Sequence, residues 1–177
     1  MDMLGIGLDF AQTLNLPAEV GDGPRTLFYP GSSIGNFTPA EALAFLRQVH
    51  AACAGGALLI GVDLVKPVDI LERAYDDLLG VTAAFNRNML RHLNALVGTD
   101  FDIADWRHVA FFNAAESRIE MHLEALAETV VRWPEGERRF APGERMHTEN
   151  SYKYRRDEFA ASRYRGVFSC ALHRTHA

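Results

Sequence analysis

The stretch FYPGSSIGNF, residues 28–37, is the segment from which the fold can be worked out. An apolar run that begins near residue 25 ends at a Pro-Gly pair and opens into a loop of small residues, which is typical of a buried strand and its exit. The residues after the loop predict a helix over about 38–52, because Thr38 can cap it, proline suits its first position and Glu41 can complete a capping box.

A second strand is expected directly after this helix. A pair of glycines turns the chain into ALLIGVDL, residues 57–64, an apolar run typical of a central parallel strand. Together these segments predict a βαβ unit, which is right-handed by default. Because open α/β sheets bind ligands beyond the carboxyl ends of their strands, the loop 31–36 and Asp63 mark a candidate site. A plain connection between two elements is an equally good interpretation of the loop.

Helical periodicity follows over residues 68–97. Gly80 and the Asn-Arg-Asn cluster at 86–88 should interrupt it, so we expect two helices or more. A short strand near Leu4–Phe10 and a short helix over Asp157–Arg163 are also expected.

Between these helices and the C-terminal region the pattern changes to strands. Three are predicted, over residues 107–113, 118–124 and 128–133. Residues 118–124 alternate strictly between polar and apolar side chains, which indicates a strand with one buried face. Three short strands in succession predict an antiparallel meander, separate from the parallel part of the chain.

Composition and charge limit the class of protein. The 177 residues can bury one sizeable core, and 48% hydrophobic with 23% charged residues is ordinary for a globular protein. A net charge of −5 argues against nucleic acid as the main partner. No apolar run approaches the roughly 20 residues of a membrane span, and the first residues lack the pattern of a secretory signal. We therefore expect a cytoplasmic protein without a membrane partner.

Several familiar catalytic patterns can be set aside. Two H-x-E pairs begin at His122 and His147, but a zinc deaminase also needs a P-C-x-x-C motif, which the sequence lacks. The seven histidines are scattered, so we expect no metal site. Ser32 and Ser33 do not lie in a G-x-S-x-G elbow and are interpreted as loop residues.

The densest group of polar side chains is HTENSYKY, residues 147–154. Glu149 and Ser151 are two positions apart, so an extended backbone would place both on one face. A carboxylate beside a hydroxyl can hold a planar N–H ligand such as imidazole, because the carboxylate accepts one N–H and the hydroxyl serves the other nitrogen. Residue types alone favour the other interpretation, a solvated polar loop.

Five segments in this order resemble the histidine-specific, S-adenosylmethionine-dependent methyltransferases of ergothioneine biosynthesis. They are GSSIGNF, GVDLVK, the run from Tyr75 to Asn86 that contains GVTAAFN, SRIEMHL and HTENSYKY. The resemblance covers about residues 8–160. It implies an α/β fold, namely a partial class I methyltransferase (Rossmann-like) sheet with an inserted α+β substrate domain. It also implies methyl transfer from S-adenosylmethionine to the α-amine of L-histidine, which forms hercynine.

The same resemblance implies roles for individual residues. Glu149 and Ser151 match the family's imidazole-binding pair, and Asn36 and Tyr75 match the residues that hold the α-carboxylate. Two further residues match positions that line this pocket, Gly31 and Met121. The opening loop would then lie beneath the methyl-transfer site.

For the domains, the resemblance implies that residues 1–66 belong to the methyltransferase core, 67–145 to the substrate-binding insertion, and 146–177 to a return to the core with a divergent end. Asp9-Phe10 resembles the family's acidic-aromatic pair near the cofactor adenine.

Other parts of the family's cofactor site have no counterpart. We find no candidate for the glycine-rich turn or the ribose-binding acid, so we expect weak or absent S-adenosylmethionine binding by this chain alone, and no turnover. Self-association, or a missing N-terminal half as partner, would follow from uncovered sheet edges. No general base is evident. The alternative is a non-catalytic remnant or subunit that binds histidine or a partner chain.

Overall fold

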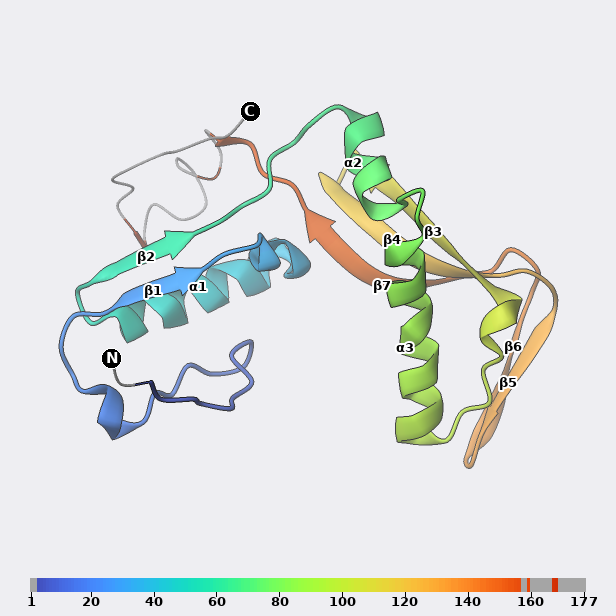
Figure 1. The fold of residues 1–177 in the computed structure, drawn as a ribbon, viewed down its shortest axis with the longest axis horizontal. Coiled ribbons are helices and arrows are strands. Elements are labelled where there is room, and N and C mark those ends of the chain that lie inside the picture. The colour runs from blue at the N-terminus through green and yellow to red at the C-terminus, as the bar shows by residue number, and fades with distance from the viewer. Residues whose placement is uncertain (1–2, 157–158, 160–166, 169–177) are drawn as a thin grey trace. The chain divides into compact units, whose positions relative to one another are not determined.

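The computed structural model describes residues 3–156, 159 and 167–168, drawn as a ribbon in Figure 1. The chain is a mixed α/β protein that divides into two compact units. The first comprises residues 1–64 and 154–177, and the second comprises Val65–Lys153. The helix expected over Asp157–Arg163 falls mostly on residues outside those described.

The first unit contains the predicted βαβ arrangement. Strands β1 (Thr26–Tyr29) and β2 (Ala57–Ile60) pair in parallel, and helix α1 (Pro39–Cys53) connects them. The capping box is present, since the Thr38 side chain accepts from the Glu41 N–H while the Glu41 carboxylate accepts from the Thr38 N–H. The helix buries one stripe of side chains, Ala42, Phe45, Leu46, Val49 and Cys53. The first strand, the helix and its start are therefore confirmed.

Two expectations for this unit are wrong: the length of the second strand, and the presence of a strand near residues 4–10. Strand β2 ends at Ile60 rather than near residue 64, and Leu64 instead forms an isolated parallel bridge with Tyr154. Residues 4–10 form no strand. The chain there runs into a turn closed by bonds from the Gln12 and Thr13 N–H groups to the Asp9 carbonyl. Gly5 and Gly7 supply no side chains that could pack a strand against a neighbour. A short 3₁₀ segment, η1 (Ala18–Val20), precedes β1.

Gly56 has a steric role at the start of β2. A Cβ at this position would lie 2.1 Å from the Arg25 carbonyl oxygen, a distance that no side chain can occupy. The close approach lets the Ala57 N–H donate to that same carbonyl, which begins the pairing of β2 with the strand before it. The glycine turn expected from the sequence is therefore required by backbone contact as well as by conformation.

The second unit begins with two helices, α2 (Val68–Tyr75) and α3 (Val81–Val97). The break at Gly80 is confirmed, with that residue in a left-handed conformation at φ 70°. The break expected at 86–88 is wrong, since α3 continues through it. Asn86 is buried there, and its amide donates to His108 Nδ1 and to the His122 carbonyl. These tertiary partners satisfy a side chain that would otherwise compete with the helix backbone.

The sheet of this unit does not have the predicted order. Strands β3 (Trp106–Asn113) and β4 (Arg118–Ala125) form an antiparallel hairpin, but the next neighbour of β4 is β7 (Arg145–Tyr152). Strand β5 (Thr129–Trp133) pairs with β6 (Gly136–Phe140) in a separate hairpin. The meander prediction is wrong for β5, because a two-residue turn joins it to β6 and makes that strand its nearest partner.

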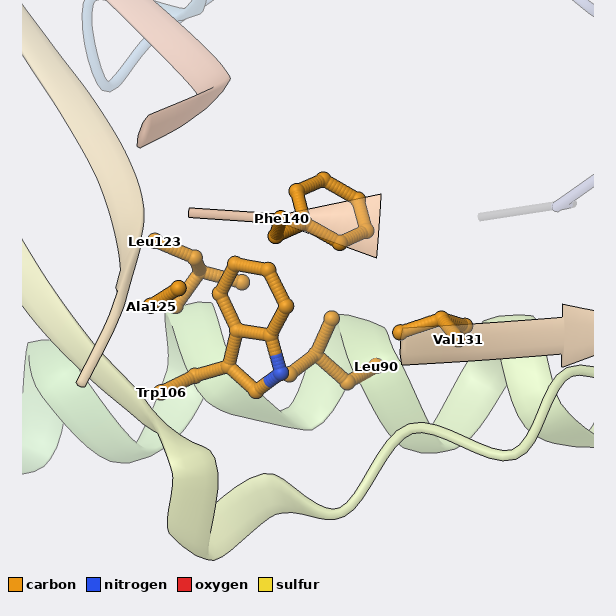
Figure 2. Close-up of a cluster of buried hydrophobic side chains, with 6 residues drawn as sticks. All are labelled: Leu90, Trp106, Leu123, Ala125, Val131 and Phe140. Carbon is orange, nitrogen blue, oxygen red and sulfur yellow. The ribbon is translucent and has the colours of Figure 1, made fainter. Parts of the chain in front are cut away.

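One hydrophobic cluster connects the β5–β6 hairpin to the sheet and to α3 (Figure 2). Its members come from five elements and are Leu90, Trp106, Leu123, Ala125, Val131 and Phe140. The Trp106 and Phe140 rings meet edge to face, with centroids 5.0 Å apart and planes at 85°. A 3₁₀ segment, η3 (Ile103–Asp105), leads into Trp106. The cluster packs the β5–β6 hairpin, the three-stranded sheet and α3 into one core of the second unit.

Candidate functional site

Strand β7 contains a bulge next to the residues predicted to bind a ligand. In the ladder with β4, Met121 pairs with Glu149, but the next residue, His122, pairs with His147. Thr148 is therefore an extra residue with no partner of its own in the ladder. Its hydroxyl donates to the Met121 carbonyl at 2.9 Å, which holds the bulge in place. Bulges re-aim the side chains that follow them.

The consequence is a change in which residues face α2. Met146 pairs with Leu123 and packs with it against α3, yet Glu149, three positions later, would point the opposite way in a regular strand. The extra residue restores it to the same face. Glu149 then lies beside Met121, and Ser151 beside Ile119, because residues paired across a ladder share a face. The predicted placement of Glu149 and Ser151 on one face is confirmed.

Helix α2 brings Tyr75 to this face. Leu71 of the helix is buried against Ile119 and Met121, and Tyr75 packs on the same cluster. The Tyr75 hydroxyl lies 2.7 Å from Ser151 Oγ, although 76 residues separate them in sequence. Four predicted site residues of the second unit, Tyr75, Met121, Glu149 and Ser151, therefore line one face of the sheet.

Lys153 belongs to this site, and the sequence reasoning missed it. Its side chain is buried, with 3% of the residue exposed, and its ammonium donates to Tyr75 Oη and to Ser151 Oγ at 2.8 Å each. The nitrogen also lies 4.6 Å from the centroid of the Tyr75 ring, within cation–π range. A signal was available, since Glu149, Ser151 and Lys153 continue one two-residue period in HTENSYKY.

The Glu149 carboxyl group is half-buried, and its surroundings change its pKa. Burial raises its pKa above the usual value, and the positive charge of Lys153 partly opposes that rise. Within the part of the chain that the structure describes, no hydrogen bond reaches the Glu149 carboxylate. It therefore keeps its acceptor capacity for an N–H group from a ligand.

The opening loop lies in the first unit, at the carboxyl ends of β1 and β2. Gly31 has a φ of 75°, and the 3₁₀ segment η2 (Ser33–Asn36) ends at the exposed Asn36. Ser32 adopts a left-handed φ of 58°, and its hydroxyl accepts from the Asp63 N–H at 2.7 Å. A non-glycine residue in this conformation is strained and is commonly found at ligand sites.

The roles of Gly31 and Asn36 in a substrate pocket stay predictions. Both belong to the first unit, whereas Tyr75, Met121 and Glu149 belong to the second.

Asp9 and Phe10 occupy a turn in the first unit. The Asp9 carboxylate accepts from the Ala11 N–H at 3.1 Å and from the Gln12 amide at 2.7 Å. The Phe10 ring lies 6.0 Å from the Tyr29 ring, and both line an apolar pocket of about 280 Å³ next to β1. The predicted role of this pair beside an adenine is not tested by this geometry.

One group of side chains has the composition of a metal site. On the opposite face of β4 and β7, ligand atoms of Glu120, His122 and His147 lie within 4.8 Å of one another. The Glu120 carboxylate already accepts from the Arg118 guanidinium at 2.7 Å. Burial lowers the pKa of His122, and the charges of His147 and Arg145 lower it further. Positive neighbours of this kind oppose a bound cation, so the group is better explained as a largely buried ion-paired cluster.

Comparison with known proteins identifies the family. The model of the histidine-specific, SAM-dependent methyltransferases matches residues 1–173. This chain belongs to that family. The family resemblance inferred from the five sequence segments is thereby confirmed, and the mixed α/β structure is consistent with a methyltransferase domain.

Individual relatives agree with the family assignment. The histidine N-alpha-methyltransferase of Mycolicibacterium smegmatis is 42% identical over 171 residues, which cover 95% of this chain and 51% of that protein. The Mycobacterium tuberculosis protein of the same name is 42% identical over 170 residues, covering 94% and 51%. Ergothioneine biosynthesis protein 1 of Schizosaccharomyces pombe is 32% identical over 112 residues, covering 62% and 14%. The chain thus spans about half the length of the mycobacterial relatives.

These relatives can be compared with the two functions expected from the sequence, a histidine-specific methyltransferase and a non-catalytic remnant or subunit. The family match supports membership of the histidine-specific methyltransferases, and nothing in the comparisons supports inactivity or the alternative of a non-catalytic remnant. Among the helices of the described residues, none combines the length and apolar character needed to cross a membrane.

Proposed function

We propose that this chain carries the histidine-binding part of a histidine Nα-methyltransferase, which transfers methyl groups from S-adenosylmethionine to the α-amine of L-histidine. The observation that supports this most directly is the face shared by Tyr75, Glu149 and Ser151, in a chain that belongs to the histidine-specific family. The half-buried carboxylate and the hydroxyl beside it suit an imidazole ring, whose two nitrogens need one acceptor and one hydroxyl partner.

The division of the chain into two units fits the class I methyltransferase interpretation. The first unit, with its parallel β1–β2 pair and α1, would be part of the Rossmann-like core. The second, Val65–Lys153, would be the inserted substrate domain. The chain passes from one unit to the other at Leu64–Val65 and again at Lys153–Tyr154, and the Tyr154 N–H donates to the Asp63 carbonyl within the first unit.

In this proposal the chain acts by binding and orienting the amino acid. Glu149 accepts a ring N–H and Ser151 contacts the other ring nitrogen, while Met121 packs beside them. Asn36 and Tyr75 hold the α-carboxylate, with Gly31 allowing close backbone approach. Binding histidine through both its ring and its carboxylate fixes the direction of the α-amine. Such positioning can supply several kcal/mol of the rate enhancement.

The residues near β1 fit the adenine of the cofactor. Phe10 and Tyr29 present aromatic rings at an apolar pocket, and the Asp9 carboxylate retains acceptor capacity beyond the two bonds it makes. When bound, S-adenosylmethionine supplies a methyl group activated by its sulfonium. We propose that Asp9 and Phe10 hold the adenine end, which would leave the substrate face of β7 to the amino acid.

Substrate competition tests the proposal. The protein, with and without a supplied N-terminal half, is incubated with S-adenosylmethionine and an equimolar mixture of L-histidine, L-phenylalanine and L-tryptophan, and mass spectrometry follows each methylated product. We expect methylated histidine to dominate, because only its ring can donate to Glu149 while accepting at the other nitrogen. Equal methylation of phenylalanine, or methylation of tryptophan in preference to histidine, would overturn the proposal.

A further inference from the structure

Three polar side chains form a closed triangle on the α2-facing side of β7. Lys153 Nζ lies 2.8 Å from both Tyr75 Oη and Ser151 Oγ, and the two hydroxyls lie 2.7 Å apart. The lysine is buried, with 3% of the residue exposed, and it directly follows the last residue of β7, Tyr152. A buried ammonium is costly unless its hydrogens are used, so these contacts constrain the lysine strongly.

The chemistry of the three groups restricts how they can share hydrogens. An ammonium group donates and cannot accept, so both hydroxyl oxygens must accept from Lys153. Each oxygen thereby uses a lone pair on the protein side. A second lone pair and the hydrogen remain on each oxygen, and the positive charge of Lys153 favours the orientation in which the hydrogen points away from the ammonium, unless that hydrogen spans the Tyr75–Ser151 contact. The triangle therefore biases two groups that could act either way toward donating.

We propose that Lys153 is a positioning residue that makes Ser151 and Tyr75 present their hydrogens to the substrate. The inference rests on the proposed function and adds to it a preference for one protonation state of the substrate ring. The substrate must offer an acceptor to each hydroxyl, and a neutral imidazole ring and a carboxylate are such acceptors. Glu149, on the same face, is the complementary acceptor for the ring N–H. Lys153 thereby favours the neutral form of the imidazole over the imidazolium, which has no lone pair for Ser151.

Binding of the substrate changes how the hydroxyl hydrogens of Tyr75 and Ser151 are used. Before binding, one hydroxyl hydrogen lies between Tyr75 and Ser151, so the pair has a single hydrogen to offer. A substrate that contacts both hydroxyls must replace that contact. Lys153 then holds both oxygens in place, because its two bonds do not depend on the contact between them.

Calorimetric titration with L-histidine and L-phenylalanine tests this role. Lys153→Met removes the ammonium and keeps the length of the stem. We expect it to weaken histidine binding about tenfold, the effect of one misdirected hydrogen bond, and to leave phenylalanine binding within about twofold. The matched control is Lys66→Met, the same change at the exposed second lysine of the chain, which should alter neither. Unchanged discrimination between the two ligands in Lys153→Met would overturn the proposal.

A double-mutant cycle separates positioning from general support of the fold. If Lys153 acts through Ser151, then Lys153→Met should cost histidine binding much less in a Ser151→Ala background than in the unmutated protein. Equal costs in both backgrounds would show that the lysine acts by some other route. Should the unmutated protein fail to distinguish histidine from phenylalanine, the proposed function itself would be wrong.

A measurement on the unmutated protein covers the case in which Lys153→Met does not fold. The chain has two lysines, so ¹⁵N labelling of lysine gives two side-chain ammonium signals. We expect the Lys153 signal to exchange slowly with water and to shift when L-histidine is added, but not when L-phenylalanine is added. An ammonium signal that ignores histidine while histidine binds would overturn the role of Lys153.

Discussion

Replacing Glu149 by glutamine removes one negative charge from the substrate face of β7 and nearly preserves the shape of the side chain. The amide oxygen can still accept from a ring N–H, so the change isolates the contribution of the charge. A hydrogen bond to a charged acceptor contributes about 1.5–3 kcal/mol and a neutral one about 0.5–1.5 kcal/mol. We therefore expect Glu149→Gln to weaken L-histidine binding by about 1–1.5 kcal/mol, or about five- to tenfold.

The pH dependence of this loss follows from burial of the carboxyl group. Because burial raises the pKa of Glu149 above its usual value, the group protonates earlier than an exposed glutamate as the pH falls. The protonated carboxyl no longer offers a charged acceptor. The difference in histidine affinity between the unmutated protein and Glu149→Gln should thus be largest at neutral pH and shrink as the pH falls through the raised pKa.

Glu149→Gln should weaken histidine binding but raise the stability of the fold at neutral pH. An acid whose pKa is raised in the folded state favours folding below its unfolded-state pKa, and this contribution is lost as the pH rises through the folded-state pKa. At neutral pH the ionised Glu149 is therefore a burden on the fold, which Glu149→Gln removes. The variant should melt at a slightly higher temperature than the unmutated protein at pH 7, and the gap should close in acid.

Calorimetric titration with L-histidine and L-phenylalanine at pH 7.5 and at about pH 5 checks these expectations, together with thermal melting at both pH values. Glu116→Gln is the matched control, since Glu116 is exposed in the turn between β3 and β4. Histidine binding unchanged by Glu149→Gln at pH 7.5, or weakened equally for phenylalanine, would refute the assignment of Glu149 to the imidazole ring.

Three further predictions concern the fold. Trp106→Ala should lower the free energy of unfolding by about 3–5 kcal/mol, because it empties the centre of a buried aromatic cluster; a urea midpoint within error of the unmutated protein would contradict this. Thr38→Ala should lower it by about 1 kcal/mol through loss of the α1 capping box, measured the same way, whereas Thr38→Ser should preserve it. Asp77 accepts from two N–H groups at the start of α3, which holds its pKa at about 2 against an ordinary 3.8. The stability it provides is present above pH 3.8 and lost as the pH falls through about 2, so Asp77→Asn should flatten the acid end of the melting curve. An unchanged dependence of melting temperature on pH would remove Asp77 from that role.

The parts of the fold that the sequence predicted well depend on neighbours along the chain. The start of α1 follows from Thr38 and Glu41, three positions apart, and the break before α3 from Gly80. The parallel strands follow from apolar runs bounded by glycine and proline. In each case the interacting groups lie within one turn or one strand, so the order of residues is sufficient to predict them.

The errors arose where distant residues set the outcome. Asn86 continues a helix because a strand residue and a carbonyl, 22 and 36 positions away, satisfy its amide. Strand β7 lies beside β4 because the hairpin β5–β6 takes its own strands out of the sheet. Neither partner is visible from the local pattern, since pairing between strands depends on which apolar faces become covered.

For the candidate site, too, the sequence predicted some features and tertiary contacts decided the others. The residue types of HTENSYKY, read with the family resemblance, were enough to single out Glu149 and Ser151 and to suggest an imidazole. The spatial arrangement came from contacts across the fold. The bulge at Thr148 turns Glu149 toward α2, and the packing of Leu71 brings Tyr75 to Ser151. Lys153 acquires its role only when those two hydroxyls meet, because an ammonium has a defined position only where partners 2.8 Å away accept its hydrogens.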